Sequence, residues 1–169
     1  AGEDGHASKQ LESYLEERAK GGVGLIVLET SAISWPAGAS MPYMLGFSKD
    51  EFIPDLQSLT QSIHQHGAKV AAQLNHSGKI AQEDTIAGRP IPVPSIPKSE
   101  PSDMFGLLTQ DEVMNFIKAG GPDGKGPRYH ELTIDEIKKE INNFAEAAKR
   151  AKKANFDAVE IHAGHGYLI

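Results

Sequence analysis

Cysteine is absent from the 169 residues of this chain. These residues therefore cannot form a disulfide, a thiolate nucleophile or a cysteine-ligated metal centre, and an iron–sulfur cluster could belong only to a region outside this chain. Long apolar runs are missing as well, since none approaches the roughly 20 residues needed to cross a bilayer. No signal-peptide pattern opens the chain. We expect a soluble, cytoplasmic protein that has no membrane partner.

A cluster of positive charge is also missing. The chain has 17 basic and 23 acidic residues, a formal net charge of −6, and its lysines are scattered along the sequence. Because phosphate backbones bind clustered basic side chains, we do not expect a nucleic-acid partner. The phosphate loop G-x-G-x-x-G is absent too, so a Rossmann fold is not favoured. A small-molecule substrate remains the expected partner, and the sequence leaves open whether the protein is a homo-oligomer.

Helices and strands are predicted to alternate along the chain. Capping boxes, in which a Ser or Thr and a Glu three residues later satisfy the first N–H groups of a helix, occur at 48–51 and 133–136. The run 23–28 is apolar without alternation, which is typical of a parallel sheet covered on both faces. This order predicts an α/β fold built on a parallel sheet. In chain order we expect helix 9–20, strand 23–28, a helix from 48 to about 67, strand 69–74, a helix from 133 and strand 158–162.

A long irregular stretch, rich in proline and glycine, separates the second and third predicted strands at about 75–132. It contains one predicted short helix, which follows a capping box at 109–112. A connection of this length usually covers an active site or is mobile. The glycine-rich tip at 120–127 is the part most suited to movement, and an exposed spacer is the alternative interpretation.

The predicted elements carry more apolar surface than the chain can cover. An apolar stripe between Ile134 and Ala148 should pack the last helix against the sheet. The outer strands lack neighbours before Ala1 and after Ile169, which leaves hydrophobic surface open. We therefore expect a piece of a larger barrel or sheet.

Polar side chains follow the last predicted strand, where α/β proteins bind ligands. Alternation along a strand points Glu160 and His162 to one face, and the branched Val159 and Ile161 to the other, under the helices. His165 lies one turn beyond His162 and can converge with it on one small polar atom. Tyr167 stands slightly farther along the same loop.

These side chains suit several kinds of chemistry. Two neutral imidazole N–H groups aimed at a carbonyl oxygen stabilise an enolate by on the order of 3 kcal/mol per donor. A phenol with a pKa near 10 stays protonated at neutral pH and can deliver a proton to a carbanion. His162, His165 and Tyr167 thus fit the reduction of an activated alkene. A metal-dependent lyase or hydrolase using Glu160 with both histidines, or a cofactor-free binding module, remains an alternative.

Two earlier strands also end in polar residues. Gln73 lies near the end of the second predicted strand, and its amide can pair with the imide edge of a flavin pyrimidine or hydrogen-bond within the core. Glu29 and Thr30 occupy the equivalent end of the first predicted strand, where ordinary strand-end polarity is the alternative explanation.

Three blocks, in this order and spacing, carry a family resemblance: 21–30, 67–79 and 154–169, the last of which ends in Glu160-Ile161-His162-Ala163-Gly164-His165-Gly166-Tyr167-Leu168-Ile169. Together they resemble the Old Yellow Enzyme family of FMN-dependent NAD(P)H:flavin oxidoreductases, and in particular the branch of bacterial enoate and 2,4-dienoyl-CoA reductases. The resemblance covers nearly the whole chain, and the last block is its most specific part.

The resemblance implies a (β/α)8 TIM barrel with FMN at its carboxyl face. Residues 1–169 would be a fragment of this single FMN-binding domain, running from helix 1 through strand 4 of the barrel. The long irregular insertion would follow strand 3, and strand 1 and strands 5–8 would be absent. We therefore expect the chain alone to have little or no reductase activity.

The resemblance also implies roles for individual residues. Gln73 would bind the flavin pyrimidine, with Thr30 beside its carbonyl edge. His162 and His165 would hold the carbonyl oxygen of an enone or enoyl thioester, and Tyr167 would be the proton donor. NADH or NADPH would reduce the flavin, and flavin N5 would pass a hydride to the β-carbon of the alkene.

Overall fold

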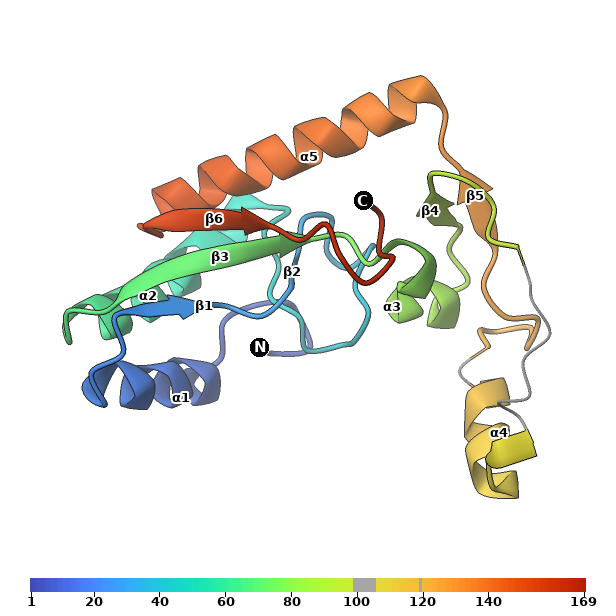
Figure 1. Cartoon of the computed structure of the whole chain (residues 1–169), viewed down its shortest axis with the longest axis horizontal. Helices are drawn as coiled ribbons and strands as arrows, with labels where there is room; N and C mark the ends of the chain where they lie inside the picture. The colour runs from blue at the N-terminus through green and yellow to red at the C-terminus, as the bar shows by residue number, and fades with distance from the viewer. Residues whose placement is uncertain (99–105, 119) are drawn as a thin grey trace.

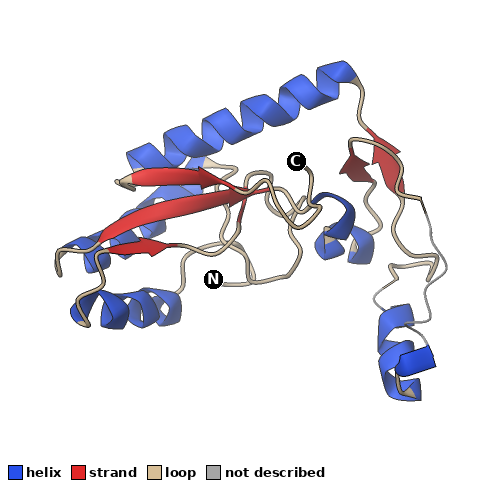
Figure 2. Ribbon diagram, viewed as in Figure 1, coloured by secondary structure: helices blue, strands red, loops and turns tan. Residues whose placement is uncertain are grey.

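A parallel four-stranded sheet forms the centre of the computed structural model, which describes residues 1–98, 106–118 and 120–169 (Figures 1 and 2). Its middle strand is β3 (Lys69–Asn75), which pairs with β1 (Leu25–Val27) and β2 (Ser31–Ala32) along one side. Strand β6 (Ala158–Ile161) pairs along the other side, also in parallel. The predicted alternation of helices and parallel strands is confirmed.

Three helices lie along one face of this sheet: α1 (Lys9–Lys20), α2 (Ile53–His64) and α5 (Ile134–Lys153). A 3-10 turn, η1 (Asp50–Phe52), leads into α2. The core lies between these helices and the strands, where apolar side chains are shielded from water. Its residues include Leu15 and Ala19 of α1, Ile26 of β1, Leu56, Leu59 and Ile63 of α2, Val70, Ala72 and Leu74 of β3, and Ala147 and Ala151 of α5.

The opposite face of the sheet is open within the described residues, as expected for a piece of a larger barrel or sheet that leaves hydrophobic surface uncovered. Leu25 and Val27 are 53% and 43% exposed, whereas Ile26 between them is buried. The apolar run at 23–28 therefore places side chains on both faces of the sheet, and helices within the described residues cover only one of these faces.

The last helix and strand are also less covered than their apolar pattern predicts. Ile134 and Ile141, in the amino-terminal half of α5, are 69% and 63% exposed, because this half extends beyond the sheet (Figure 1). Val159 and Ile161 of β6 are about half exposed, although the sequence analysis placed them under helices. Only the carboxyl-terminal half of α5, around Ala147, packs against the described sheet.

Local hydrogen bonds account for where the helices begin. Ser8 caps α1 by accepting the N–H of Leu11 at 3.2 Å. Thr133 and Glu136 form the predicted capping box at the start of α5. Bonds from the Thr133 backbone and from His130 lower the pKa of the Glu136 carboxyl to about 2. The capping box predicted at 48–51 is wrong, because the Ser48 hydroxyl instead donates to the carbonyl oxygen of Trp35.

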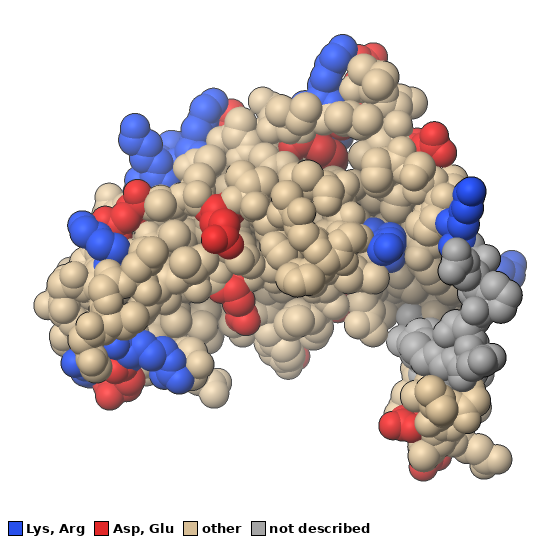
Figure 3. All heavy atoms as spheres, viewed as in Figure 1, with Lys and Arg blue, Asp and Glu red and all other residues tan. Residues whose placement is uncertain are grey.

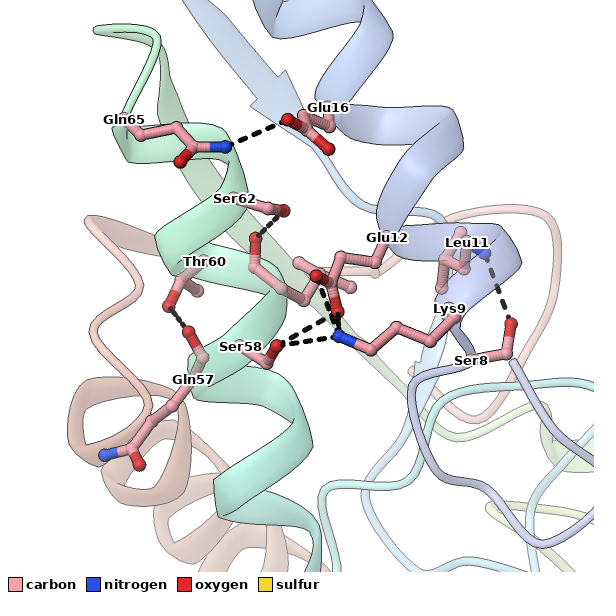
Figure 4. Close-up of polar contacts among 11 residues, drawn as sticks. Ser8, Lys9, Leu11, Glu12, Glu16, Gln57, Ser58, Thr60, Ser62 and Gln65 are labelled. Carbon is pink, nitrogen blue, oxygen red and sulfur yellow. Dashed lines mark hydrogen bonds and ion pairs between the residues drawn. The ribbon is translucent and has the colours of Figure 1, made fainter.

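Polar contacts join α1 and α2 along their length (Figure 4). The Ser58 hydroxyl donates to the Glu12 carboxylate at 3.0 Å, and Lys9 bonds the same carboxylate. One turn farther on, the amide nitrogen of Gln65 donates to Glu16 at 2.9 Å. These partly exposed bonds link the two helices outside the core, and bonds of this kind contribute little to stability.

The stretch between β3 and α5 contains more regular structure than the sequence indicated. Its predicted short helix is α4 (Gln110–Lys118), which begins with the predicted capping box at Thr109. Two three-residue strands were missed because they are short and one contains proline. The additional elements are η2 (Gly78–Ile80), α3 (Gln82–Ile86), and the parallel pair of β4 (Ile91–Val93) and β5 (Tyr129–Glu131). Residues 99–105 and 119 of the predicted insertion lie outside the described residues.

No described helix is both long and apolar enough to cross a bilayer. Acidic and basic side chains are interspersed over the face seen in Figure 3, both at its rim and within it. This distribution agrees with the scattering of lysines along the sequence.

Candidate active site

The carboxyl ends of β3 and β6 lie side by side and bring predicted site residues together. Gln73 and Glu160 are partners in the strand register, so their side chains leave the sheet on the same, open face. The Gln73 amide nitrogen donates a hydrogen bond to the Glu160 carboxylate. The Gln73 amide therefore lies near the carboxyl end of β6, where the loop that follows β6 begins.

Three aromatic side chains of that loop form a compact cluster. His165 Nδ1 and His162 Nε2 are 3.2 Å apart, so one of these nitrogens donates to the other. The ring centre of Tyr167 lies 5.0 Å from that of His162 and 6.1 Å from that of His165. Positive φ angles at His165 and Gly166 make the tight turn that folds the loop back on itself. The three rings are therefore neighbours in the structure, while the convergence of His162 and His165 on one polar atom stays a prediction.

The backbone of the same loop rests on the turn that follows β3. The N–H of Leu168 donates to the carbonyl oxygen of His76 at 3.1 Å. A Cβ atom at Gly78, where φ is +51°, would lie 2.7 Å from the Leu168 nitrogen, so only glycine permits this approach. Sequence analysis assigned no role to His76 or Gly78, although a histidine and a glycine directly after a strand were visible signals.

Comparison with known proteins places this arrangement in a family. The sequence model described as "NADH:flavin oxidoreductase / NADH oxidase family" matches residues 1–169. The chain belongs to this family. A relative named NADH oxidase from Thermoanaerobacter brockii is 36% identical over 169 residues, all of this chain and 22% of the relative. A relative named NADPH dehydrogenase from Halalkalibacterium halodurans is 38% identical over 157 residues, 93% of this chain and 38% of the relative.

Solved structures agree on the fold. The Old Yellow Enzyme from Pichia sp. AKU4542 matches with a TM-score of 0.78 at 23% identity, over 99% of this chain and 40% of that structure. The described elements are therefore part of a TIM barrel, in which α1 through β6 correspond to helix 1 through strand 4. The chain spans well under half the length of each of these relatives.

The sheet contains a β-bulge beside Gln73. Val27 pairs with Ala71 and Ser31 pairs with Leu74. The chain thus advances four residues from β1 to β2 while β3 advances three, which leaves one extra residue on the β1–β2 side. The extra residue interrupts the ladder and separates β1 from β2. Thr30 therefore lies in the bulge, at the strand end nearest Gln73. The Ser31 hydroxyl supports this bend by donating to the carbonyl oxygen of Glu29 at 3.0 Å.

The residues at this edge fit the flavin that the family name implies. Val27 exposes apolar surface on the open face, whereas Leu25, also exposed there, pairs with Lys69 at the amino end of the sheet, away from this edge. The Gln73 amide on the same face offers a donor and an acceptor that can pair with a pyrimidine edge. The fit to a flavin at this edge therefore rests on the Gln73 amide, which can both donate and accept a hydrogen bond.

A metal centre has less support from the same geometry. The described residues contain no group of three or more His, Asp or Glu side chains placed to hold a metal ion. Glu160 bonds the Gln73 amide, while His162 and His165 contact each other. The three side chains of the metal hypothesis therefore point to different partners.

Proposed function

We propose that this chain forms the catalytic part of an FMN-dependent oxidoreductase that reduces an activated alkene, an enone or enoyl thioester, with NADH or NADPH. The observation that carries this proposal is the cluster of His162, His165 and Tyr167 at the carboxyl edge of the sheet. The names of the relatives, NADH oxidase and NADPH dehydrogenase, support the choice of a nicotinamide as co-substrate. We also propose that the protein acts in the cytoplasm.

In this proposal Gln73 and Thr30 hold the flavin. Gln73 pairs with the pyrimidine edge through its amide, and Thr30 approaches the same ring from the bulge. When bound, FMN supplies the hydride chemistry. Residues 1–169 then act as one part of a single barrel domain, from helix 1 through strand 4, with strand 1 and strands 5–8 supplied from outside the chain.

The histidines bind and polarise the alkene substrate. The facing nitrogens of His162 and His165 bond each other at 3.2 Å, so a carbonyl oxygen that binds between the rings replaces this bond and accepts one N–H from each ring. Such donors stabilise the negative charge that develops on the oxygen, worth about 3 kcal/mol for each bond. His162 and His165 therefore orient the substrate and activate its double bond.

Tyr167 supplies the proton that completes the reduction. Its ring packs edge-on against His162, so the phenol is held next to the carbonyl-binding point. A phenol is a weak enough acid to remain protonated at neutral pH and a strong enough one to protonate a carbanion. The proton goes from the Tyr167 hydroxyl to the α-carbon of the substrate, and solvent restores it afterwards.

The test compares the Tyr167→Phe variant with the unchanged protein. Both are produced as the full gene product, with any residues that the gene encodes outside 1–169. We expect both proteins to contain FMN and to accept hydride from NADH or NADPH at similar rates. Reduction of an enone should fall by about a hundredfold in the variant, the usual size of a general-acid contribution. Stopped-flow absorbance of the flavin separates the two half-reactions.

Tyr14→Phe is the matched control, because Tyr14 is half exposed on α1 and removed from the cluster. It should leave both half-reactions unchanged. A protein without flavin would contradict the proposed cofactor, and equal enone reduction in Tyr167→Phe would contradict the assigned proton donor. The 169-residue chain by itself should bind FMN poorly, so strong enone reduction by this chain alone would contradict the proposed division of the barrel.

A further inference from the structure

His76 is a buried histidine with no part in the chemistry proposed above. Only 2% of its surface is exposed, and it directly follows β3 at the edge that carries the site. Burial lowers the pKa of His76, and the nearby carboxylates of Glu140 and Asp84 oppose this effect only in part. A neutral ring leaves one nitrogen free to accept a hydrogen bond.

That acceptor shapes the turn beneath the catalytic loop. His76 Nδ1 accepts the N–H of Gly78 at 3.1 Å, two residues along the chain. Gly78 is thereby held in a left-handed conformation, at φ +51°. The Tyr167–Leu168 peptide lies against this glycine so closely that a Cβ atom there would be 2.8 Å from the carbonyl carbon of Tyr167.

The other side of the ring rests on the loop after β2. A Cβ atom at Gly38 would lie 2.6 Å from Cδ2 and 2.7 Å from Nε2 of His76, so the imidazole packs directly on this glycine backbone. The Gly38 N–H donates at 2.8 Å to Asp84, whose carboxylate is 1% exposed and also pairs with Arg89. The imidazole of His76 therefore lies between the Gly38 backbone, which Asp84 holds by a hydrogen bond, and the Gly78 turn, which supports the loop after β6.

We propose that His76 is the positioning residue of the His162–His165–Tyr167 cluster. Its Nδ1 fixes the Gly78 turn on which the Tyr167–Leu168 peptide lies, and its carbonyl oxygen holds the Leu168 N–H. This role deepens the proposed function and rests on it for its catalytic consequence. The structural part, loop placement, stands on these contacts alone.

Two substitutions at His76 distinguish the effect of its hydrogen-bond acceptor from the effect of its side-chain volume. Asn in the variant His76→Asn can accept the N–H two residues on, as asparagine does in Asx turns. Leu in the variant His76→Leu fills space without an acceptor. We expect hydrogen exchange at the Leu168 amide to rise on the order of tenfold in His76→Leu, the loss expected for one hydrogen bond, and to return towards the original rate in His76→Asn.

Imidazole nitrogen shifts of His162 and His165 give a second measure. These shifts should change in His76→Leu, because the loop that carries both rings moves in that variant. In His76→Asn the loop should keep its original position, so the shifts should match those of the unchanged protein. In the flavin-containing protein, enone reduction should fall about tenfold to a hundredfold in His76→Leu with unchanged FMN content, since small misplacements of reacting groups cost that much.

His66→Leu is the matched control: the same replacement at a histidine that bonds Glu16 near the end of α2. It should leave Leu168 exchange and the two imidazole shifts unchanged. Equal Leu168 exchange in His76→Leu and His76→Asn would overturn the proposal. If the loop measurements behave as expected while no FMN is bound, the proposed function fails and the positioning role survives.

Discussion

The two ends of the parallel sheet are built from similar residue types but serve different purposes. At the amino end, around Asp157, histidine and carboxylate side chains bind one another and the backbone. At the carboxyl end, the rings of His162, His165 and Tyr167 contact mainly one another and remain partly exposed. The comparison shows that histidines at the two strand ends have different partners, and the proposed chemistry belongs to the carboxyl end, where barrel enzymes carry their active sites.

Asp157 stabilises the amino end of the sheet through hydrogen bonds and an ion pair. Its carboxylate accepts from the Val70 N–H at 2.9 Å, from His64 at 2.8 Å and from Lys69 at 2.9 Å. Burial by itself would raise the pKa of Asp157, but these bonds outweigh it and hold the pKa well below its usual range. The bonds tie the end of α2 to the starts of β3 and β6, so little is left to bind a ligand.

The largest expected contrast between the two ends is in catalysis. His162→Ala and His165→Ala should each slow enone reduction by about a hundredfold to a thousandfold, because each removes one donor to the carbonyl oxygen. His64→Ala, at the amino end, should leave the turnover number unchanged. Steady-state kinetics on all three variants, with FMN content matched, measures the contrast. A similar loss in His64→Ala would break the comparison.

A buried hydroxyl at the amino end should affect stability alone. Thr60 is fully buried and donates to the carbonyl oxygen of Ala154 at 2.7 Å. Thr60→Val keeps the shape but leaves that carbonyl without its donor, which should lower the free energy of unfolding by about 1–3 kcal/mol. Urea denaturation measures this loss, and enone reduction should not change. Ser58→Ala, a partly exposed site, should cost less than about 0.5 kcal/mol.

Two identical capping motifs sharpen the contrast between the sheet and the insertion. Thr133→Ala removes the cap of α5, which packs on β3 and β6, and should lower global stability by about 1 kcal/mol. Thr109→Ala removes the same cap from α4 and should leave the global unfolding midpoint unchanged, because among the described elements α4 makes few contacts with any other. Equal shifts in thermal midpoint would show that α4 is part of the cooperative unit.

The smallest effect is a dependence of stability on acid. The pKa of Asp157 is lower in the folded protein than its unfolded value of about 3.9, so the unfolded state takes up the proton first as pH falls. The stability that Asp157 contributes is therefore complete above about pH 4 and is lost progressively below it. Asp157→Asn should remove this part of the pH dependence, which urea titrations between pH 7 and pH 3 can measure. An unchanged acid profile would show that these bonds do not contribute to stability.

Local patterns were sufficient to predict most of the regular structure. The helix starts at Lys9 and after Thr133 were predicted because the caps at both places depend on neighbours within three residues. The run 23–28 was predicted as a strand because a continuous apolar run is a local signal, and β1 lies within it. Ser48 failed as a cap because its hydroxyl found a partner, Trp35, thirteen positions away in the chain.

The candidate site was predicted in part. His162, His165 and Tyr167 lie within six residues of one another, so one turn suffices to bring them together, as the structure shows. The bulge that places Thr30 depends on register with β3, and sequence analysis did not predict it. His76 was missed because its partners come from the loops after three different strands.

The sequence by itself determined the helix starts, the order of the parallel strands and the identity of the three clustered aromatic side chains, because each depends on residues close together in the chain. Only the tertiary structure decided which sheet face stays open, where the bulge falls and what supports the loop after β6. Those features depend on strand register and on contacts between distant segments, such as Gly38 with His76 and Gly78 with Leu168. Loop closure over such distances leaves no periodic signal in the sequence.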